Sequence, residues 1–433
     1  MSGFRIVAGV GWAALAAAGT PAGGAAQACP VGAPVAFVNV QVLAMDAERL
    51  SGPVTVVVRD GKVSALNPAA PPPDACRVTG TGKVLMPGLA DLHVHTSERE
   101  MPLFLAAGVT LVREMNGTPG LIALRDRIAR GEAVGPTMLV ASPLLVGRPL
   151  QYRHLLLKSP DEAYQAAHQI KDARYDFLKI YDGLSRPAYD ALIEAGATLH
   201  LPLDGHIPAD VGLAAALAAG QSLQHMDKIA FALAGHSGDT SAFAEARRLF
   251  RGRRAWVTPT LASLRALDNA GTVEYAAGFD RPEMAYVDSA SLGWWRSLSG
   301  TRSRTGASPV YRFQAALLPV LRESGARFLL GTDAGNPLMV AGFSVHEELA
   351  ILVRDGGLTP YEALTAATRN VGEFLGDSFR GRIVPGAPAD LLLVDANPLT
   401  DLAPLRTPTG VMAKGRWFPR AELDSMLVAA KQR

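Results

Sequence analysis

The chain has 433 residues, of which 48% are hydrophobic and 19% are charged, and its formal net charge is +2. This composition excludes the class of disordered chains, which combine low hydrophobicity with high net charge. Lys and Arg (42) nearly balance Asp and Glu (40), and no basic cluster stands out, so no nucleic-acid partner is expected.

The first 28 residues predict an export signal. One charge, Arg5, precedes an apolar stretch over 6–18, and residues 26–28 read Ala-Gln-Ala, a small-residue cleavage pattern. We therefore assign 1–28 to a signal peptide and expect a periplasmic or secreted protein. A membrane anchor is the alternative, although the apolar run is short and broken by glycines. No later stretch is long enough to cross a bilayer, so no stable membrane span is expected after cleavage.

The chain has two cysteines, Cys29 and Cys76. In an exported protein they can form one disulfide that ties the new N-terminus to the first small domain. Two free thiols are the alternative. Cleavage after Ala28 would also place Cys29 where a lipid can be attached.

Short β-strands are predicted at both ends of the chain. Alternating apolar residues mark strands at 35–43, 54–58 and 62–66, with a hairpin turn at Asp60-Gly61. Similar runs lie at 381–384, 390–395 and 410–417. Because so few strands cannot bury a core alone, we expect residues 29–87 and 379–433 to meet in one small β-sandwich.

Between the two ends, at 88–378, short apolar runs alternate with amphipathic or Ala-rich helical stretches, the pattern of βα units. The predicted strands are 89–95, 110–114, 137–141, 177–181, 201–206, 222–225, 256–261 and 328–332. Eight βα repeats predict an α/β fold, a TIM (β/α)8 barrel. The long connection 263–308 contains Trp294 and Trp295, which either cover a substrate pocket or pack inside the insertion.

Ionisable side chains lie on these strands or follow them directly. They are His93, His95, Lys179, His206, His225 and Asp333. Barrel enzymes place catalytic groups at the carboxyl ends of their strands, so we expect these side chains to converge. Four histidines and one aspartate exceed what one catalytic zinc needs, which favours two metal ions.

Two cations about 3.5–4 Å apart need a bridging anion besides water. A buried lysine can lose its proton, and its neutral amine can react with CO2 to form a carbamate. Lys179 is the candidate for this carboxylated bridging ligand. Zinc is the expected metal, and manganese or cobalt are alternatives.

The order His-x-His, Lys, His, His, Asp on successive barrel strands resembles the amidohydrolase superfamily, in particular its imidazolonepropionase-like and prolidase-like group. The most specific matches are Met86-Pro-Gly-Leu-Ala-Asp-Leu-His-Val-His95 and Leu330-Gly-Thr-Asp-Ala-Gly335. The resemblance extends over almost the whole chain after residue 28. It implies a distorted TIM barrel flanked by a β-sandwich from both chain ends.

The resemblance also implies roles for the six residues. His93, His95 and Asp333 would bind the first metal, His206 and His225 the second, and carboxylated Lys179 would bridge them. A hydroxide shared by the metals would attack a substrate carbonyl, with Asp333 as general base and then general acid. The implied activity is that of an exported, dipeptidase-like amidohydrolase that cleaves a C–N bond in a dipeptide or an N-acyl amino acid.

Two departures from related patterns narrow this reaction. Ala209 stands where mononuclear deaminases of the superfamily carry a glutamate, which disfavours base deamination. Lys179 disfavours true imidazolonepropionases, which use a single metal. The segment 147–154 lacks the Gly-His pair of many prolidase-like members, so the sequence leaves substrate recognition open.

Three residues are candidate substrate ligands. Tyr181 shares a strand face with Lys179 and could contact the substrate carbonyl or simply pack. His346 could hydrogen-bond near Asp333 or cap the following helix. Arg113 could hold a substrate carboxylate or form a structural ion pair.

The expected partner is a small-molecule substrate, and the chain could form a homo-oligomer. Esters, lactones or phosphotriesters are alternative substrates of the same site. A more remote alternative is an exported binding protein that lost turnover.

Overall fold

The computed structural model describes residues 28–235, 241–300 and 305–431. Apart from Ala28, the segment predicted to be a signal peptide lies outside these residues. Within the described part of the chain, no helix has both the length and the hydropathy that crossing a bilayer requires.

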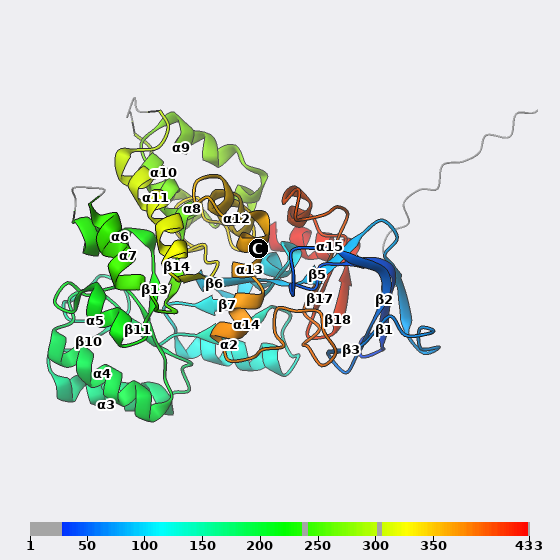
Figure 1. The fold of residues 1–433 in the computed structure, drawn as a ribbon, viewed down its shortest axis with the longest axis horizontal. Helices are drawn as coiled ribbons and strands as arrows, with labels where there is room; N and C mark the ends of the chain where they lie inside the picture. The colour runs from blue at the N-terminus through cyan, green and yellow to red at the C-terminus, as the bar shows by residue number, and fades with distance from the viewer. Residues whose placement is uncertain (1–27, 236–240, 301–304, 432–433) are drawn as a thin grey trace, which may run out of the picture.

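Strands from both chain ends form one sheet at one side of the molecule, where blue and red strands lie together in Figure 1. Its order is β18-β17-β16-β5-β1-β2-β3, with β4 beside β1. The strands are β1 (Val35–Val42), β2 (Ser51–Arg59), β3 (Lys62–Leu66), β4 (Cys76–Thr79), β5 (Val84–Pro87), β16 (Leu391–Val394), β17 (Gly410–Ala413) and β18 (Arg416–Pro419). The two ends therefore share a sheet as expected. The strands are hydrogen-bonded into a single sheet, so its description as a sandwich stays a prediction.

Two details of the C-terminal strands were predicted wrongly. Residues 381–384 form turns instead of a strand, although Ile383 is buried and its N–H donates to the Ala44 carbonyl at 3.2 Å. Residues 410–417 form most of a hairpin instead of one strand, because Lys414 and Gly415 turn the chain with φ of 50° and 79°. The pair Lys414-Gly415, which interrupts the apolar run, was the sequence signal for this two-residue turn.

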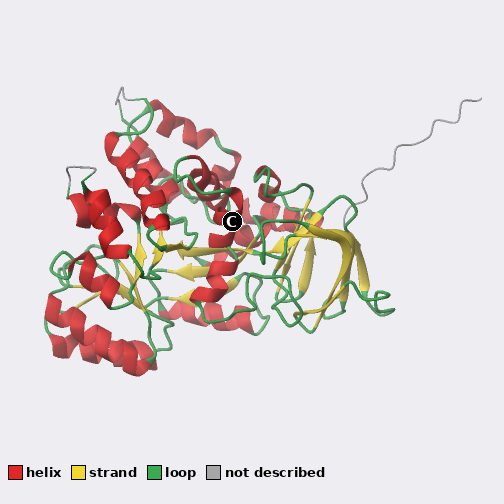
Figure 2. Ribbon diagram, in the orientation of Figure 1, coloured by secondary structure: helices red, strands yellow, loops and turns green. Residues whose placement is uncertain are grey.

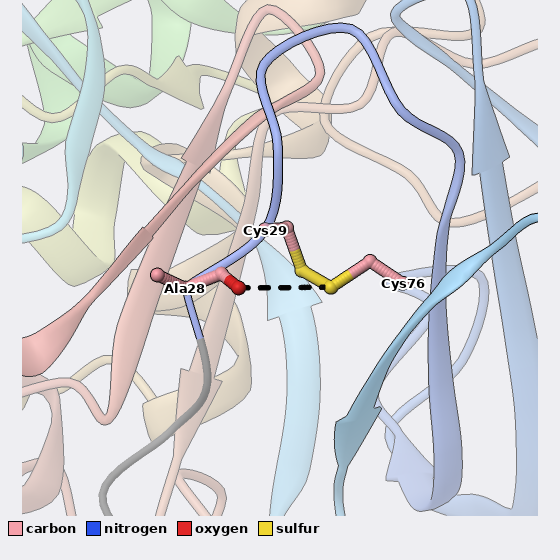
Figure 3. The surroundings of a disulfide bond; sticks show 3 residues. All are labelled: Ala28, Cys29 and Cys76. Carbon is pink, nitrogen blue, oxygen red and sulfur yellow. Dashed lines mark hydrogen bonds between the residues drawn. A yellow bond between two sulfur atoms is a disulfide. The ribbon is translucent and has the colours of Figure 1, made fainter.

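Side-chain contacts join the two ends of the chain. The rings of Phe37 and Trp417 meet edge to face, with centroids 5.1 Å apart. Cys29 and Cys76 form the expected disulfide, with Cα atoms 5.7 Å apart and the Ala28 carbonyl nearby (Figure 3). Because both sulfur atoms take part in this disulfide, neither free thiols nor a lipid on Cys29 is compatible with it.

Eight parallel strands form a closed barrel at the positions predicted for them. They are β6 (Leu89–Val94), β7 (Val109–Glu114), β8 (Thr137–Val140), β11 (Leu178–Ile180), β12 (Leu203–Gly205), β13 (Ser222–Gln224), β14 (Trp256–Thr258) and β15 (Arg327–Phe328). Single bridges complete the ring, Ala141 with Phe177 and Val94 with Ala334. Two strands that were not predicted, β9 (Leu144–Val146) and β10 (His154–Leu156), extend the sheet beside β11.

Helices lie around the barrel strands (Figure 2). They are α1 (Met101–Ala106), α2 (Pro119–Ala129), α3 (Pro160–Asp172), α4 (Arg186–Leu199), α5 (Gly212–Ala218), α6 (Met226–Ala234), α7 (Ala242–Phe250), α8 (Leu261–Asn269), α9 (Val273–Ala277), α10 (Ser289–Ser297), α11 (Pro309–Glu323), α12 (Ser344–Arg354), α13 (Pro360–Ala366), α14 (Arg369–Phe374) and α15 (Arg420–Lys431). The long insertion after β14 is thus largely helical, with α8, α9 and α10 inside it. The division of the chain into domains at residues 28, 87 and 378 stays a prediction.

Candidate metal centre

The six residues predicted as metal ligands line one cavity of about 450 Å³, here called the metal cavity. His93 lies near the end of β6 and His95 follows it, while Lys179 is the middle residue of β11. His206 and His225 come directly after β12 and β13. Asp333 follows the last barrel strand, where its N–H donates to the His93 carbonyl at 2.8 Å. The barrel therefore brings together side chains that are up to 240 positions apart.

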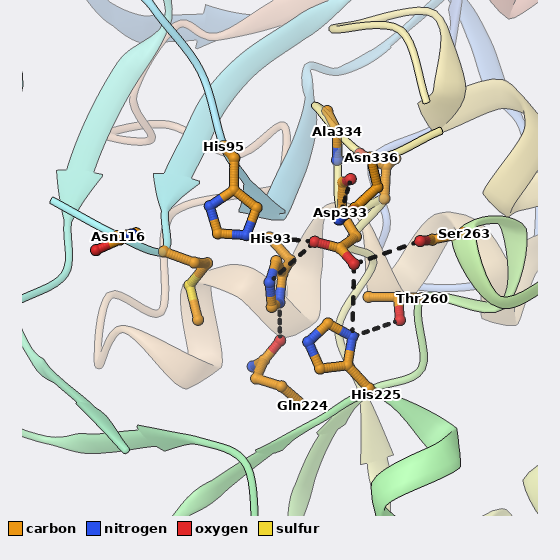
Figure 4. A network of polar contacts seen from close by, with 12 residues as sticks. His93, His95, Asn116, Gln224, His225, Thr260, Ser263, Asp333, Ala334 and Asn336 are labelled. Carbon is orange, nitrogen blue, oxygen red and sulfur yellow. Dashed lines mark hydrogen bonds and ion pairs between the residues drawn. The ribbon is translucent and has the colours of Figure 1, made fainter. Parts of the chain in front are cut away.

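Asp333 lies at the centre of this group (Figure 4). Its Oδ1 is 3.4 Å from Nε2 of His93 and 3.4 Å from Nε2 of His95, and its Oδ2 is 3.9 Å from Nδ1 of His225. Ligand atoms of His93, His225 and Asp333 all lie within 4.8 Å of one another. The His206 ring centroid is 5.1 Å from that of His225, so the fourth histidine adjoins the same group.

In three of the imidazoles, Nδ1 forms a hydrogen bond that orients the ring. Nδ1 of His93 lies 2.6 Å from Oε1 of Gln224, and Nδ1 of His225 lies 2.8 Å from Oγ1 of Thr260. Nδ1 of His206 lies 3.1 Å from Oδ1 of Asp182. Such outer partners fix the ring and leave Nε2 free for a metal ion. Sequence reasoning missed all three partners; the only sequence signal was that Gln224 is a polar residue in a buried strand.

The electrostatics of His206, His225 and Asp333 suit metal ligands, whereas the His95 ring holds a proton that a metal ion would have to displace. Burial lowers the pKa of His206 to about 4 and that of His225 to about 3, so both rings are neutral at pH 7. Burial opposes ionisation of Asp333, but His93, His95 and His225 together hold its pKa well below the usual value. Burial also opposes a charge on His95, yet hydrogen bonds to Asp333 and Glu114 raise its pKa to about 9.

Lys179 is a buried amine without a partner. The residue is 1% exposed, and Nζ has no hydrogen-bond partner among the described residues. Burial lowers its pKa to about 8, while the charges of Asp204 and Asp333 oppose that shift. A buried polar group that lacks a partner is costly and calls for a functional explanation.

The backbone at the site has an unusual conformation at three places. His225, Thr260 and Asp333 have φ of 66°, 50° and 60°, in the left-handed region that residues with side chains seldom adopt. Each such residue costs about 1–3 kcal/mol, and such residues cluster at functional sites. The conformation aims the His225 ring, its Thr260 partner and the Asp333 carboxylate at a common point.

Two of the three predicted substrate ligands lie elsewhere. Arg113 is 1% exposed, forms an ion pair with Asp204, and its guanidinium lies 4.5 Å from the Phe177 ring centroid. It is therefore a structural residue. His346 is also buried, and its Nε2 lies 3.0 Å from the Ala107 carbonyl oxygen. Neither residue is among the described residues that line the metal cavity.

Aromatic side chains form part of the cavity wall. Tyr181 lines the cavity as predicted, with its ring centroid 4.0 Å from that of His206. Trp294 also lines it and is 47% exposed, whereas Trp295 is buried and belongs to the core. Of the two interpretations of this tryptophan pair, lining of a pocket therefore applies to Trp294, and packing inside the insertion applies to Trp295.

Glu348, on α12, supports the site from behind and was not singled out from the sequence. Its two carboxylate oxygens accept the N–H groups of Leu261 at 3.0 Å and Ala262 at 2.6 Å, at the start of α8. Thr260, the partner of His225, directly precedes this helix. Ser263, in the first turn of α8, places its Oγ 3.3 Å from Oδ2 of Asp333.

Replacing Glu348 by alanine is expected to lower the free energy of unfolding by about 1–3 kcal/mol, because two buried N–H groups lose their acceptor. Urea unfolding of the metal-free protein measures this change. Glu323→Ala is the control, since its side chain is 59% exposed. Equal stability of the two variants would contradict a supporting role for Glu348.

Comparisons with known proteins place the chain in a family. The model of the Amidohydrolase family matches residues 84–418, well over half of the chain. An imidazolonepropionase from Deinococcus deserti is 43% identical over 83 residues, which are 19% of this chain and 21% of that protein. An adenine deaminase from the same organism is 27% identical over 375 residues, 80% of this chain and 55% of that protein. The chain thus matches about a fifth to a half of the length of these relatives.

Solved structures share the fold. A bottromycin amidohydrolase has a TM-score of 0.76 at 24% identity, over 92% of this chain and 90% of that one. A putative prolidase from Bifidobacterium longum has a TM-score of 0.70 at 24% identity, over 93% and 100% of the two chains. Because the family model spans the barrel together with β5, β16, β17 and most of β18 of the sheet, this chain belongs to the amidohydrolase family.

Proposed function

We propose that the protein is an exported, binuclear metal-dependent hydrolase that cleaves the C–N bond of a dipeptide or an N-acyl amino acid. The observation that carries this proposal is the convergence of four histidines, Asp333 and the unpartnered amine of Lys179 on one cavity. The amidohydrolase and prolidase names of the structural neighbours support an amide as the target.

The donor set fits two metal ions with a carboxylated lysine between them. His93, His95 and Asp333 would hold one ion, and His206 and His225 the other. Neutral imidazoles and an ionised carboxylate are the forms that bind divalent metals, and His206, His225 and Asp333 already have them at pH 7, whereas metal binding would release a proton from His95. The neutral amine of Lys179 is the form that reacts with CO2. Formation of the carbamate would explain why Nζ is buried without a hydrogen-bond partner among the described residues. When bound, the metal pair supplies Lewis-acid activation of water and of the substrate carbonyl.

Asp333 is the residue placed to move the proton. Its side chain is 12% exposed and its carboxylate is ionised at neutral pH, so it can accept a proton from the attacking water. The same carboxylate can then pass that proton to the departing amine. Ser263 and the three histidines around it hold its two oxygens in place.

Export is supported by the disulfide between Cys29 and Cys76, because such bonds persist in oxidising compartments. Periplasmic or secreted protein is expected to begin at Cys29 after cleavage. Mass spectrometry of the mature N-terminus tests this, and protein that retains residue 1 in the cytoplasm would contradict it.

The proposed reaction can be tested with a substrate panel. Purified protein is expected to contain about two divalent ions per chain. Among dipeptides, N-acetyl amino acids, lactones and aryl esters, the first two classes should give the highest kcat/KM. A higher kcat/KM for esters or lactones would contradict the assignment to amides, and metal-loaded protein that turns over none of them would contradict an enzyme of this class.

A matched pair of variants ties the activity to this centre. His225 and His200 both have positive φ, of 66° and 54°, and asparagine is, like histidine, among the residues with side chains that adopt positive φ most often. His225→Asn removes a ligand and should lower metal content and activity together. His200→Asn, at an exposed position, should leave both unchanged.

A further inference from the structure

We propose that the substrate extends from the metal cavity into an adjoining chamber and binds Arg148 in the wall of that chamber. The substrate would be a peptide-like amide longer than a dipeptide, with apolar side chains and a C-terminal carboxylate. This inference rests on the proposed function and specifies the substrate of that same site.

The second chamber lies beside the metal cavity and has a volume of about 540 Å³. Asp227 and Lys228, in the first turn of α6, line both spaces. The remaining wall is mainly apolar, with Ile207, Ala230, Val310 and Phe313 among its members. Small-molecule sites usually measure about 300–1,000 Å³, so the metal cavity alone suffices for a small ligand and the two spaces together suit a much larger one.

Arg148 is a cation in the wall of this chamber. Asp182 lies on the same wall, but His206 and Lys228 already contact its two oxygens at 3.1 Å and 3.6 Å. Arg148 is exposed, and its charge helps lower the pKa of the Asp182 carboxyl, but it forms no ion pair with a described residue. A guanidinium binds a carboxylate through two parallel hydrogen bonds, which makes a carboxylate the matching end group.

The position of Arg148 is fixed by backbone packing. A Cβ atom added to Gly147 would lie 1.7 Å from the Gly183 carbonyl oxygen, so the two chain segments touch at this point. A Cβ atom added to Gly183 would lie 3.0 Å from Cγ of Arg148, so the missing side chain leaves room for the arginine stem. The two glycines therefore hold the stem of Arg148 against the wall of the chamber.

Asp227 offers an acceptor where the two spaces meet. Its Oδ1 is buried and has no hydrogen-bond partner among the described residues. Buried acceptors are nearly always satisfied, so a ligand donor is expected here. A substrate that runs from one space to the other would supply the N–H of an additional amide at this position. Peptide-like chains combine this donor with apolar side chains and a terminal carboxylate.

The test compares alanine-leucine peptides of two, three and four residues, each with a free or an amidated C-terminus. With metal-loaded protein, kcat/KM is expected to rise about 10- to 100-fold from the dipeptide to the best longer peptide, as one or two charged hydrogen bonds would provide. Amidation of the longer peptide should remove most of that gain. A ratio of longer peptide to dipeptide near one would overturn the inference.

Variants assign the effect to the chamber. Arg148→Ala should lower the ratio of the two kcat/KM values about tenfold or more, mainly through KM, and Arg148→Lys should restore part of it. Arg153→Ala removes the same charge from an exposed position in the same segment and should keep the wild-type ratio. Val310→Trp, at a position that is 57% exposed, should fill the chamber and lower the ratio without loss of the fold.

The outcomes also separate the two proposals. Dipeptide hydrolysis without any gain from length, or equal ratios for Arg148→Ala and Arg153→Ala, would overturn the second chamber and leave the proposed function standing. Absence of hydrolysis for every peptide would overturn the proposed function together with the inference.

Discussion

Lys179→Ala is expected to lose most of its metal and to lower kcat/KM by more than about a hundredfold. Even partners outside the ligand set usually cost about 10- to 100-fold in affinity or activity, and a shared bridge should cost more. Without it, the second ion keeps only His206 and His225 among the six residues. The measurements are metal content per chain and kcat/KM on the best substrate of the panel.

Short carboxylic acids provide a chemical test of the same variant. The space left by the Lys179 side chain can admit acetate or propionate, whose carboxylate can take the place of the carbamate. Part of the metal content and activity should therefore return with added acid. Lys171→Ala, at an exposed position on α3, is the control and should respond to neither change. Full activity of Lys179→Ala without added acid would contradict the bridging role.

Lys179→Met separates function from stability. Methionine has a similar length and lacks the amine, so the buried unpartnered nitrogen disappears while packing is kept. The metal-free variant is expected to unfold with a free energy about 1–3 kcal/mol higher than wild type. If Lys179 served only to stabilise the fold, Lys179→Met would instead lower the free energy of unfolding.

Asp333→Asn is expected to lower kcat by about 10²- to 10⁴-fold, the range typical of losing a general base and acid. Asparagine keeps the shape of the side chain and one oxygen toward the histidines, but it cannot accept the proton. KM should change far less than kcat, because the loss affects the chemical step.

Steady-state kinetics on the best amide substrate measure this effect, and metal analysis shows whether the ions are retained. Asp46→Asn makes the same change at an exposed position in the loop after β1 and should behave as wild type. If Asp333→Asn with a full complement of metal kept a kcat near that of wild type, another group would have to move the proton.

Much of the barrel could be predicted because its strands are buried on both faces and therefore appear as continuous apolar runs. The convergence of the six candidate ligands on one cavity could be predicted because each of them follows or interrupts such a run, as His225 and Asp333 do. The sequence does not say which polar residue on one strand meets which on another. For this reason the sequence could not decide whether Arg113 binds the substrate or forms an ion pair. Its partner, Asp204, lies 91 positions away.

The residues that support the ligands were harder to predict. Glu348 reaches the start of α8 from 86 and 87 positions away, and Thr260 meets His225 from 35 positions away. No local pattern encodes such contacts, because the first depends on how α12 packs against α8 and the second on which strand lies beside β13 in the barrel. His346 shows the same limit, since only the packing of α12 reveals that its ring lies against Ala107.

The position of β5 between β1 and β16 has a consequence for folding. Lys83, next to β5, meets Asp395 across 312 positions, with the whole barrel between them. During synthesis β5 therefore exposes an open, apolar edge until the last part of the chain has emerged. Such late, non-local pairing slows folding and leaves the nascent protein prone to aggregation. A chain cut short before β16 keeps that edge permanently, so barrels made without the final strands should accumulate as insoluble material.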